Sequence, residues 1–253
     1  MRRSSTDSRP LHKVLRIEGE SIPYTVEWRK VKYPRLELKT GKLKIILPKG
    51  VKDETPILER NLQWILKRHE EIKRAKENIA NSLSGNGILI FGSFYKVEPG
   101  IPLVIFLNGI QKKFDLMKER DQVKLRNFLK RILKEELRKL VNHYSSKFGL
   151  RFGRIYIRNQ KTKWASCSSS GNLSFNFRLV HVPYDILKYV VCHEVLHLAE
   201  KGHSKKFWEK IREEFPNYKE MEKKLFEYWF FTMDSQFPDI RFIGKRKTSR
   251  NLE

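Results

Sequence analysis

One apolar stripe through residues 118–147 constrains the fold more than any other feature of this sequence. Apolar residues recur there every three or four positions, and lysines and arginines occupy the opposite face. This spacing is typical of a long amphipathic α-helix with one face buried in a core and the other exposed. The stripe consists of Leu125, Phe128, Leu129, Ile132, Leu133, Leu137, Leu140, Val141, Tyr144 and Phe148.

The segments before this helix have mixed character. Residues 13–47 contain several β-type stretches, and a turn at Gly41 joins two of them into an expected hairpin. Thr55 and Pro56 indicate the start of a helix that continues to about residue 80. Residues 88–106 return to strand composition. This order of elements predicts an α+β fold.

A strand and three helices are expected after the long helix. In residues 172–179 apolar and polar side chains alternate, which predicts a strand with one face in the core and the other facing water or a cleft. Pro183 ends this strand and opens a helix over residues 184–200, which stops at a glycine turn. Two shorter helices follow, over residues 205–214 and 217–231.

Charge and cysteine content limit the classes of protein to consider. The 253 residues include 53 Lys and Arg against 29 Asp and Glu, a net charge of +24. Such an excess favours loose, salt-sensitive binding to nucleic acid, although a solvated lysine-rich surface without a partner explains it equally well. Two cysteines, Cys167 and Cys192, are too few for a disulfide framework, and we expect both to be small buried hydrophobes.

No targeting or membrane segment is visible in the sequence. The first residues, MRRSSTDSRP, lead directly into strand-like sequence without an apolar signal region. The sequence contains no run of about 18 apolar residues, the length needed to span a bilayer. We therefore expect a soluble, cytoplasmic protein.

The densest chemistry lies in residues 190–208, VVCHEVLHLAEKGHSKKFW. His193, Glu194 and His197 form the pattern H-E-x-x-H inside an expected helix. Residues four apart stand one turn above each other on one helix face, so both imidazoles can bind a single tetrahedral Zn²⁺. Glu194 then lies beside the position of a zinc-bound water, where it can act as a base.

A catalytic zinc site needs a third protein ligand and an open position for water. His203 follows after LAEKG, and we expect the Gly202 turn to bring it back to the same metal. A carboxylate from a later helix, Glu209, Glu213 or Glu220, is the competing third ligand. Three imidazoles and a carboxylate buried together without a metal would be costly, which argues against the interpretation of His193 and His197 as mere polar residues of a partly buried helix.

These residues resemble the YgjP-like metallopeptidases, relatives of the SprT-like and WLM zinc peptidases. The resemblance rests on KTKWASCSSSGNLSFNFRL, on VVCHEVLHLAEKGHSKKFW and on the later FPNY, with weaker echoes toward the N-terminus. It covers about residues 14–230. One departure is Ala165, where the family usually has glycine, and its methyl group could narrow the cleft.

The resemblance implies a zincin-like catalytic core, a small antiparallel sheet plus an active-site helix, with His193, His197 and His203 as zinc ligands and Glu194 as general base. It implies peptide-bond hydrolysis by a metal-activated water. In zincins an extended substrate pairs with an edge strand above the active helix. We expect the strand at 172–179 to take this place, with Asn176 and Arg178 as substrate-binding residues.

We expect four regions in the chain. They are a flexible tail (1–12), an N-terminal β-rich region with one long helix (13–115), a zincin-like catalytic region (116–235) and a basic C-terminal tail (236–253). The peptide or protein substrate and the oligomeric state stay open, and the basic surface suggests action near nucleic acid, as for SprT-like relatives.

Two other functions stay open at this point. A metal-dependent nucleotide phosphohydrolase suits the basic charge, but the sequence lacks a glycine-rich phosphate loop. A non-enzymatic nucleic-acid-binding protein with structural zinc would need a fourth protein ligand. Cys192 is a poor candidate because it points about 100° around the helix from His193.

Overall fold

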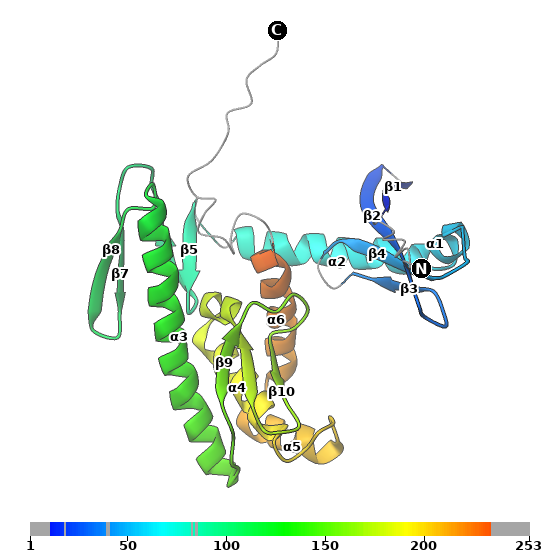
Figure 1. Cartoon of the computed structure of the whole chain (residues 1–253). Helices are drawn as coiled ribbons and strands as arrows, with labels where there is room; N and C mark the ends of the chain where they lie inside the picture. Colours follow the sequence, from blue (N-terminus) through cyan, green and yellow to red (C-terminus); the bar gives the residue numbers. More distant parts are fainter. Residues whose placement is uncertain (1–10, 18, 39–40, 82, 84–85, 234–253) are drawn as a thin grey trace, which may run out of the picture. The chain divides into compact units, whose positions relative to one another are not determined.

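The computed structural model describes residues 11–17, 19–38, 41–81, 83 and 86–233. These residues form the expected α+β fold, in two compact units that divide between Ala75 and Lys76 (Figure 1). The tail expected at residues 236–253 lies outside the described residues, as do residues 1–10. Leu11 and His12, which were expected in the N-terminal tail, instead begin the first strand.

The first unit contains one four-stranded mixed sheet. The central pair β2 and β4 is parallel, whereas β1 and β3 pair antiparallel at the two edges, in the order β1-β2-β4-β3. The expected hairpin at Gly41 is confirmed, since β3 pairs with β4 and Gly41 has a φ of 73°. The strands are β1 (Leu11–Ile17), β2 (Glu20–Arg29), β3 (Arg35–Glu37) and β4 (Leu43–Pro48).

The helix expected from Thr55 to about residue 80 is two helices, α1 (Thr55–Arg60) and α2 (Leu62–Asn81). The break lies at Asn61, whose side-chain amide donates to the backbone carbonyl of Ile57 at 2.8 Å. Asparagine side chains compete in this way with the helical backbone ladder. The division between the two units falls inside α2, well before the boundary at residue 115 that the sequence suggested.

The second unit begins with two hairpins and the long helix. The hairpin strands are β5 (Gly87–Ile90), β6 (Ser93–Lys96), β7 (Leu103–Leu107) and β8 (Ile110–Phe114). Helix α3 (Glu119–Phe148) confirms the expected stripe, because its apolar positions are buried from Leu125 to Tyr144. Gly149 ends it in the left-handed conformation, with a φ of 64°.

A three-stranded mixed sheet follows, made of β9 (Ile155–Arg158), β10 (Ala165–Cys167) and β11 (Leu173–Asn176) in the order β10-β11-β9. Strand β11 lies in the centre, antiparallel to β10 and parallel to β9. The prediction of a purely antiparallel sheet is therefore wrong in this detail. The exposed edge beside the following helix belongs to β10 and not to the strand that contains Asn176.

The strand predicted over residues 172–179 ends at Asn176. The Asn176 side chain accepts a hydrogen bond from the backbone N–H of Arg178, and Phe177–His181 form the short 3₁₀ helix η1. Two hydrogen bonds fix η1 to the β5–β6 hairpin. Phe91 N–H donates to the Val180 carbonyl at 2.7 Å, and Nδ1 of His181 lies 2.7 Å from the Leu89 carbonyl.

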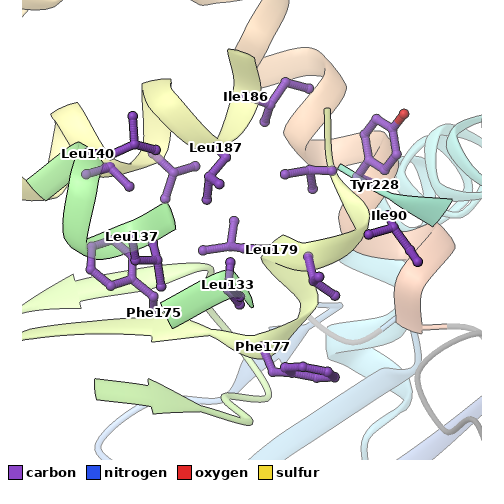
Figure 2. Packing of buried hydrophobic residues seen from close by; sticks show 14 of the residues in the cluster. Ile90, Leu133, Leu137, Leu140, Phe175, Phe177, Leu179, Ile186, Leu187 and Tyr228 are labelled. Carbon is purple, nitrogen blue, oxygen red and sulfur yellow. The ribbon is translucent and has the colours of Figure 1, made fainter. Parts of the chain in front are cut away.

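Helices α4 (Tyr184–Leu196), α5 (Lys205–Glu214) and α6 (Tyr218–Met233) complete the unit. Figure 2 shows the core that α4 and α6 share with α3 and the sheet, where Leu133 and Leu137 of α3 lie among Phe175, Leu179 and Leu187. Ser204 caps α5, as its hydroxyl accepts from the Phe207 N–H. No helix among the described residues has the length and apolar character needed to cross a membrane.

His181 gives the second unit a pH-dependent contribution to stability. Its side chain is buried, and burial lowers its pKa to about 4 from 6.5, with Arg178 adding to the effect and the Leu89 hydrogen bond opposing it. Below pH 6.5 the unfolded chain binds a proton at this residue that the folded chain excludes. The stabilisation is thus complete above pH 6.5 and is lost as the pH falls toward 4.

We predict that His181→Gln, whose amide can still donate to Leu89, removes this dependence. Between pH 7.5 and 4.5 the free energy of unfolding of the wild type should fall by about 2 to 3 kcal/mol more than that of the variant. Urea unfolding of metal-free protein, followed by tryptophan fluorescence, measures both. Equal losses in the two proteins would contradict a neutral, buried His181.

Candidate metal centre

Helix α4 carries the H-E-x-x-H residues at the end of a buried segment. Nine of its 13 residues are buried, and the apolar ones cover nearly its whole circumference. The polar residues of the motif lie in the last turn of α4, where His193 is partly buried and Glu194 is 8% exposed. The surrounding core therefore fixes where these side chains point.

The helix ends earlier than the sequence predicted. Its last residue is Leu196, His197 is the C-cap, and tight turns continue to Glu200. The ring atom Nδ1 of His197 lies 2.8 Å from the Glu200 carbonyl oxygen, which can only accept a hydrogen bond. The Nδ1 atom must therefore carry the proton, which leaves the lone pair of Nε2 free for a metal. Such a bond to the second ring nitrogen is typical of metal-binding histidines.

His203 lies exposed in the stretch between α4 and α5. From the sequence, we expected the conformational freedom of Gly202 to allow the turn before His203. The backbone does not require glycine there, because its φ is not positive and an added Cβ would meet no atom within 4 Å. The early end of α4 and the Ser204 cap of α5 direct the chain instead.

The three histidines come together as expected. The Nε2 atom of His193 lies 3.1 Å from Nε2 of His197 and 3.0 Å from Nε2 of His203. Nitrogens bound to one tetrahedral zinc at roughly 2.0–2.1 Å lie about 3.3 Å apart, so the set fits a zinc ion. Among the described residues, this is the group of His, Cys, Asp and Glu side chains close enough to hold a metal.

The electrostatics of the cluster keep the imidazoles of His193 and His203 neutral. Burial, together with the neighbouring His197 and His203, lowers the pKa of His193 to about 3. Burial and His197 also lower the pKa of His203, while Glu222 opposes the change. Only a neutral imidazole offers a lone pair to a metal, so both rings are in the binding form at neutral pH.

Phe207 of α5 forms an apolar floor beneath the cluster. Its fully buried ring lies 4.9, 4.8 and 5.0 Å from the rings of His193, His197 and His203. The short stretch from His203 to Phe207 thus supplies both one imidazole of the cluster and the apolar ring that contacts all three imidazoles. The apolar floor keeps water away from one side of the ligands.

Glu194 combines burial with an unpaired oxygen. Its Oε2 atom is buried without a hydrogen-bond partner in the described part of the chain. Burial raises the pKa of Glu194 to about 7, and Lys163 and the backbone N–H of Cys167 oppose this rise. A buried carboxylate with a pKa near neutrality is suited to take up and release a proton.

Lys163 is the residue near the site that the sequence did not single out. It precedes β10, and the side-chain amide of Asn176 donates to the Lys163 carbonyl at 3.0 Å and to the Gln160 carbonyl at 2.8 Å. These bonds hold the loop that places the Lys163 ammonium group where it lowers the pKa of Glu194. The sequence signal that could have indicated Lys163 is its place in KTKWASC, two residues before the edge strand β10.

The two expected substrate-binding residues have other contacts. Asn176 is 1% exposed and its polar atoms serve the neighbouring loop and η1. Arg178 is partly buried, with its guanidinium carbon 5.6 Å from the centre of the Trp229 ring and a close contact to Met233. A direct substrate contact of either residue stays a prediction.

The remaining candidates lie outside the cluster. Glu209 pairs with Lys205 at 3.8 Å on the exposed face of α5. Cys192 is fully buried, and burial raises the pKa of its thiol to about 12, while Cys167 is only partly buried, against expectation. Ala165 is 9% exposed and belongs to the hydrophobic core, so its methyl group packs inward.

A family model matches most of the chain. The family model described as "YgjP-like, metallopeptidase domain" matches residues 32–228. A structural match is the crystal structure of the metallopeptidase zymogen abylysin of Pyrococcus abyssi, with 24% sequence identity and a TM-score of 0.33; the match covers 35% of this chain and 90% of that one. No curated protein matches the chain.

We predict that the purified protein binds about one zinc ion per chain with three histidine ligands. His203→Ala should lower the zinc content after dialysis against a weak chelator, measured by plasma mass spectrometry. His143→Ala, which removes an exposed histidine from α3, serves as the matched control and should retain the metal. A zinc content that is unchanged by His203→Ala would exclude this residue as a ligand.

Proposed function

Because the chain belongs to the YgjP-like metallopeptidase family, we propose that it is a zinc-dependent peptidase that hydrolyses peptide bonds, with Glu194 as the general base. The observation that carries the proposal is the unpaired, buried carboxylate of Glu194 in the same helical turn as two of three converging histidines. A structural metal site has no use for such a carboxylate. A hydrolytic site needs it.

The ligand set supports a catalytic rather than a structural metal. His193, His197 and His203 would hold the zinc ion, and three protein ligands leave a fourth position open. Zinc bound there would supply Lewis acidity for a carbonyl oxygen and would lower the pKa of a coordinated water. Structural sites usually have four protein ligands, and neither cysteine belongs to this group.

The proposed role of Glu194 follows from its surroundings. Its carboxylate takes a proton from the attacking water, and the resulting carboxylic acid returns that proton to the leaving amine. The raised pKa, about 7, makes both steps accessible near neutral pH. The Cys167 N–H holds the carboxylate while Oε2 stays unpaired.

Strand β10 offers a place for an extended peptide. Among the strands that the structure describes, it is an edge strand that pairs with β11 alone, in the register Ala165↔Phe175 and Cys167↔Leu173. The Asn176 N–H donates to the Trp164 carbonyl, and the Ser168 N–H donates to the Asn172 carbonyl just before β11. By alternation, Ala165 and Cys167 direct their backbone groups to the free edge. The Cys167 N–H on this edge reaches Glu194. We propose that substrate adds as a strand here.

We predict that Glu194→Gln keeps the zinc but lowers peptide hydrolysis by about 10²-fold or more, because the amide cannot accept a proton. Turnover of a quenched fluorescent peptide library by zinc-loaded protein measures the effect. Glu209→Gln, at an exposed glutamate of α5, is the matched control and should stay active. The same proteins are tested against a panel of nucleoside triphosphates, which would reveal the alternative phosphohydrolase activity. Undiminished peptide hydrolysis by Glu194→Gln would contradict the assignment of Glu194 as the general base.

We propose further that α3 carries a surface for nucleic acid. Lys130, Lys134 and Arg138 follow each other at four-residue spacing, so they form one exposed ridge. Within the described residues none of the three forms an ion pair, unlike Lys124 and Lys139 of the same helix. Unpaired cations in a row are suited to successive phosphates.

We predict that replacing Lys130, Lys134 and Arg138 by Gln weakens binding to duplex DNA. The slope of log K against log salt should fall by about 0.9 for each phosphate contact that is lost. The matched control replaces Lys49, Lys52 and Lys67, exposed lysines of the first unit, and removes the same net charge. Fluorescence anisotropy across a salt series measures both. Equal effects of the two triple variants would refute a dedicated ridge.

A further inference from the structure

His203 is held differently from the other two candidate ligands. His193 and His197 belong to the end of the buried helix α4, and His197 has its hydrogen bond to Glu200. His203 is exposed and lies outside any helix. Within the described part of the chain, its Nδ1 atom has no hydrogen-bond partner that would fix the ring. Something else must therefore hold the third ligand in place.

An aromatic stack provides that hold. The His203 ring lies 5.4 Å from the Trp208 ring at an interplanar angle of 23°. The Trp208 ring lies 5.2 Å from the Tyr218 ring at an angle of 29°. The three rings thus stack in the order His203, Trp208, Tyr218. Phe207 meets His203 at 88°, edge to face, and closes the adjacent side.

The stack connects the exposed stretch to two helices. Trp208 lies in the first turn of α5, whose N-terminus is fixed by the Ser204 cap, and Tyr218 is the first residue of α6. Both rings are partly buried. The Ser204 hydroxyl also donates to the Glu200 carboxylate at 3.4 Å. This bond links the residue just after His203 to the turn that follows His197.

We propose that Trp208, supported by Tyr218, is a positioning residue that orients the His203 imidazole for zinc. The inference rests on the proposed zinc site and extends it to the residues that prepare the third ligand. An exposed side chain without this contact would sample several rotamers, and binding zinc would have to order it. The stack orders the ring in advance, which strengthens metal binding without a contact to the metal.

A positioning role of Trp208 affects zinc affinity separately from the stability of the fold. Loss of a packing contact lowers the stability of the folded protein, but it changes zinc affinity only if the contact orients a ligand. Residues that orient metal ligands typically contribute 10–100-fold to metal affinity. The effect of Trp208 should also be much smaller when His203 is absent, because the Trp208 ring stacks on His203, whereas it meets His193 only edge to face, at 6.2 Å and 68°.

The experiment measures zinc dissociation constants of the full chain by competition with a chromophoric chelator. Trp208→Leu should weaken zinc binding about 10–100-fold. Trp208→Phe should restore most of the affinity, because a ring can still stack on His203, and Tyr218→Leu should weaken binding less than Trp208→Leu. Trp64→Leu, which removes an exposed tryptophan from the first unit, is the matched control and should bind zinc as the wild type does.

A double-mutant cycle tests whether Trp208 acts through His203. In the His203→Ala background, Trp208→Leu should cause a much smaller further loss of zinc affinity than in the wild type. The visible spectrum of the cobalt-substituted protein reports coordination independently, and Trp208→Leu should shift it toward that of His203→Ala. Thermal unfolding of the metal-free variants separates misfolding from loss of orientation.

The outcomes are distinct. Equal zinc affinity of the wild type and a folded Trp208→Leu overturns the inference and leaves the proposed function intact. Equal losses from Trp208→Leu in the presence and absence of His203 also overturn it, since the tryptophan then acts on the whole fold. A wild type without measurable zinc binding overturns both proposals.

Discussion

Helix α4 is stable only when other elements surround it, because apolar side chains cover nearly its whole circumference. Burial of such a helix leaves it little freedom to rotate or slide, since any movement would expose core residues to water. The polar residues of the motif occupy only its last turn, where the helix meets the surface. The positions of His193, Glu194 and His197 are therefore consequences of core packing.

Each element around α4 also contributes to the site. The long helix α3 packs along it through the apolar stripe, and the β5–β6 hairpin fixes its start through the hydrogen bonds to η1. Strand β10 brings the Cys167 N–H to Glu194. Helix α5 returns beneath the histidines with Phe207 and beside them with Trp208. The site is thus assembled from segments far apart in the sequence, around the last turn of α4.

The sequence predicted the parts of this arrangement that depend on local periodicity. The H-E-x-x-H spacing, the stripe of α3 and the third histidine follow from helix geometry and from short connections, and the structure agrees with them. It missed features decided by single tertiary hydrogen bonds. Asn176 continues the alternating pattern, yet its side chain binds the loop at 160–163 and ends the strand. Likewise, nothing in the periodicity of α4 reveals that it stops at Leu196, or that a lysine before β10 faces Glu194.

Extended X-ray absorption fine structure at the zinc edge of the zinc-loaded protein tests the central claim most directly. The account predicts three imidazole nitrogens and one further light atom at roughly 2.0–2.1 Å, with no sulfur. A sulfur ligand at about 2.3 Å would place a cysteine on the metal and indicate a closed, structural site. That result would contradict both the ligand set and the open position on which hydrolysis depends.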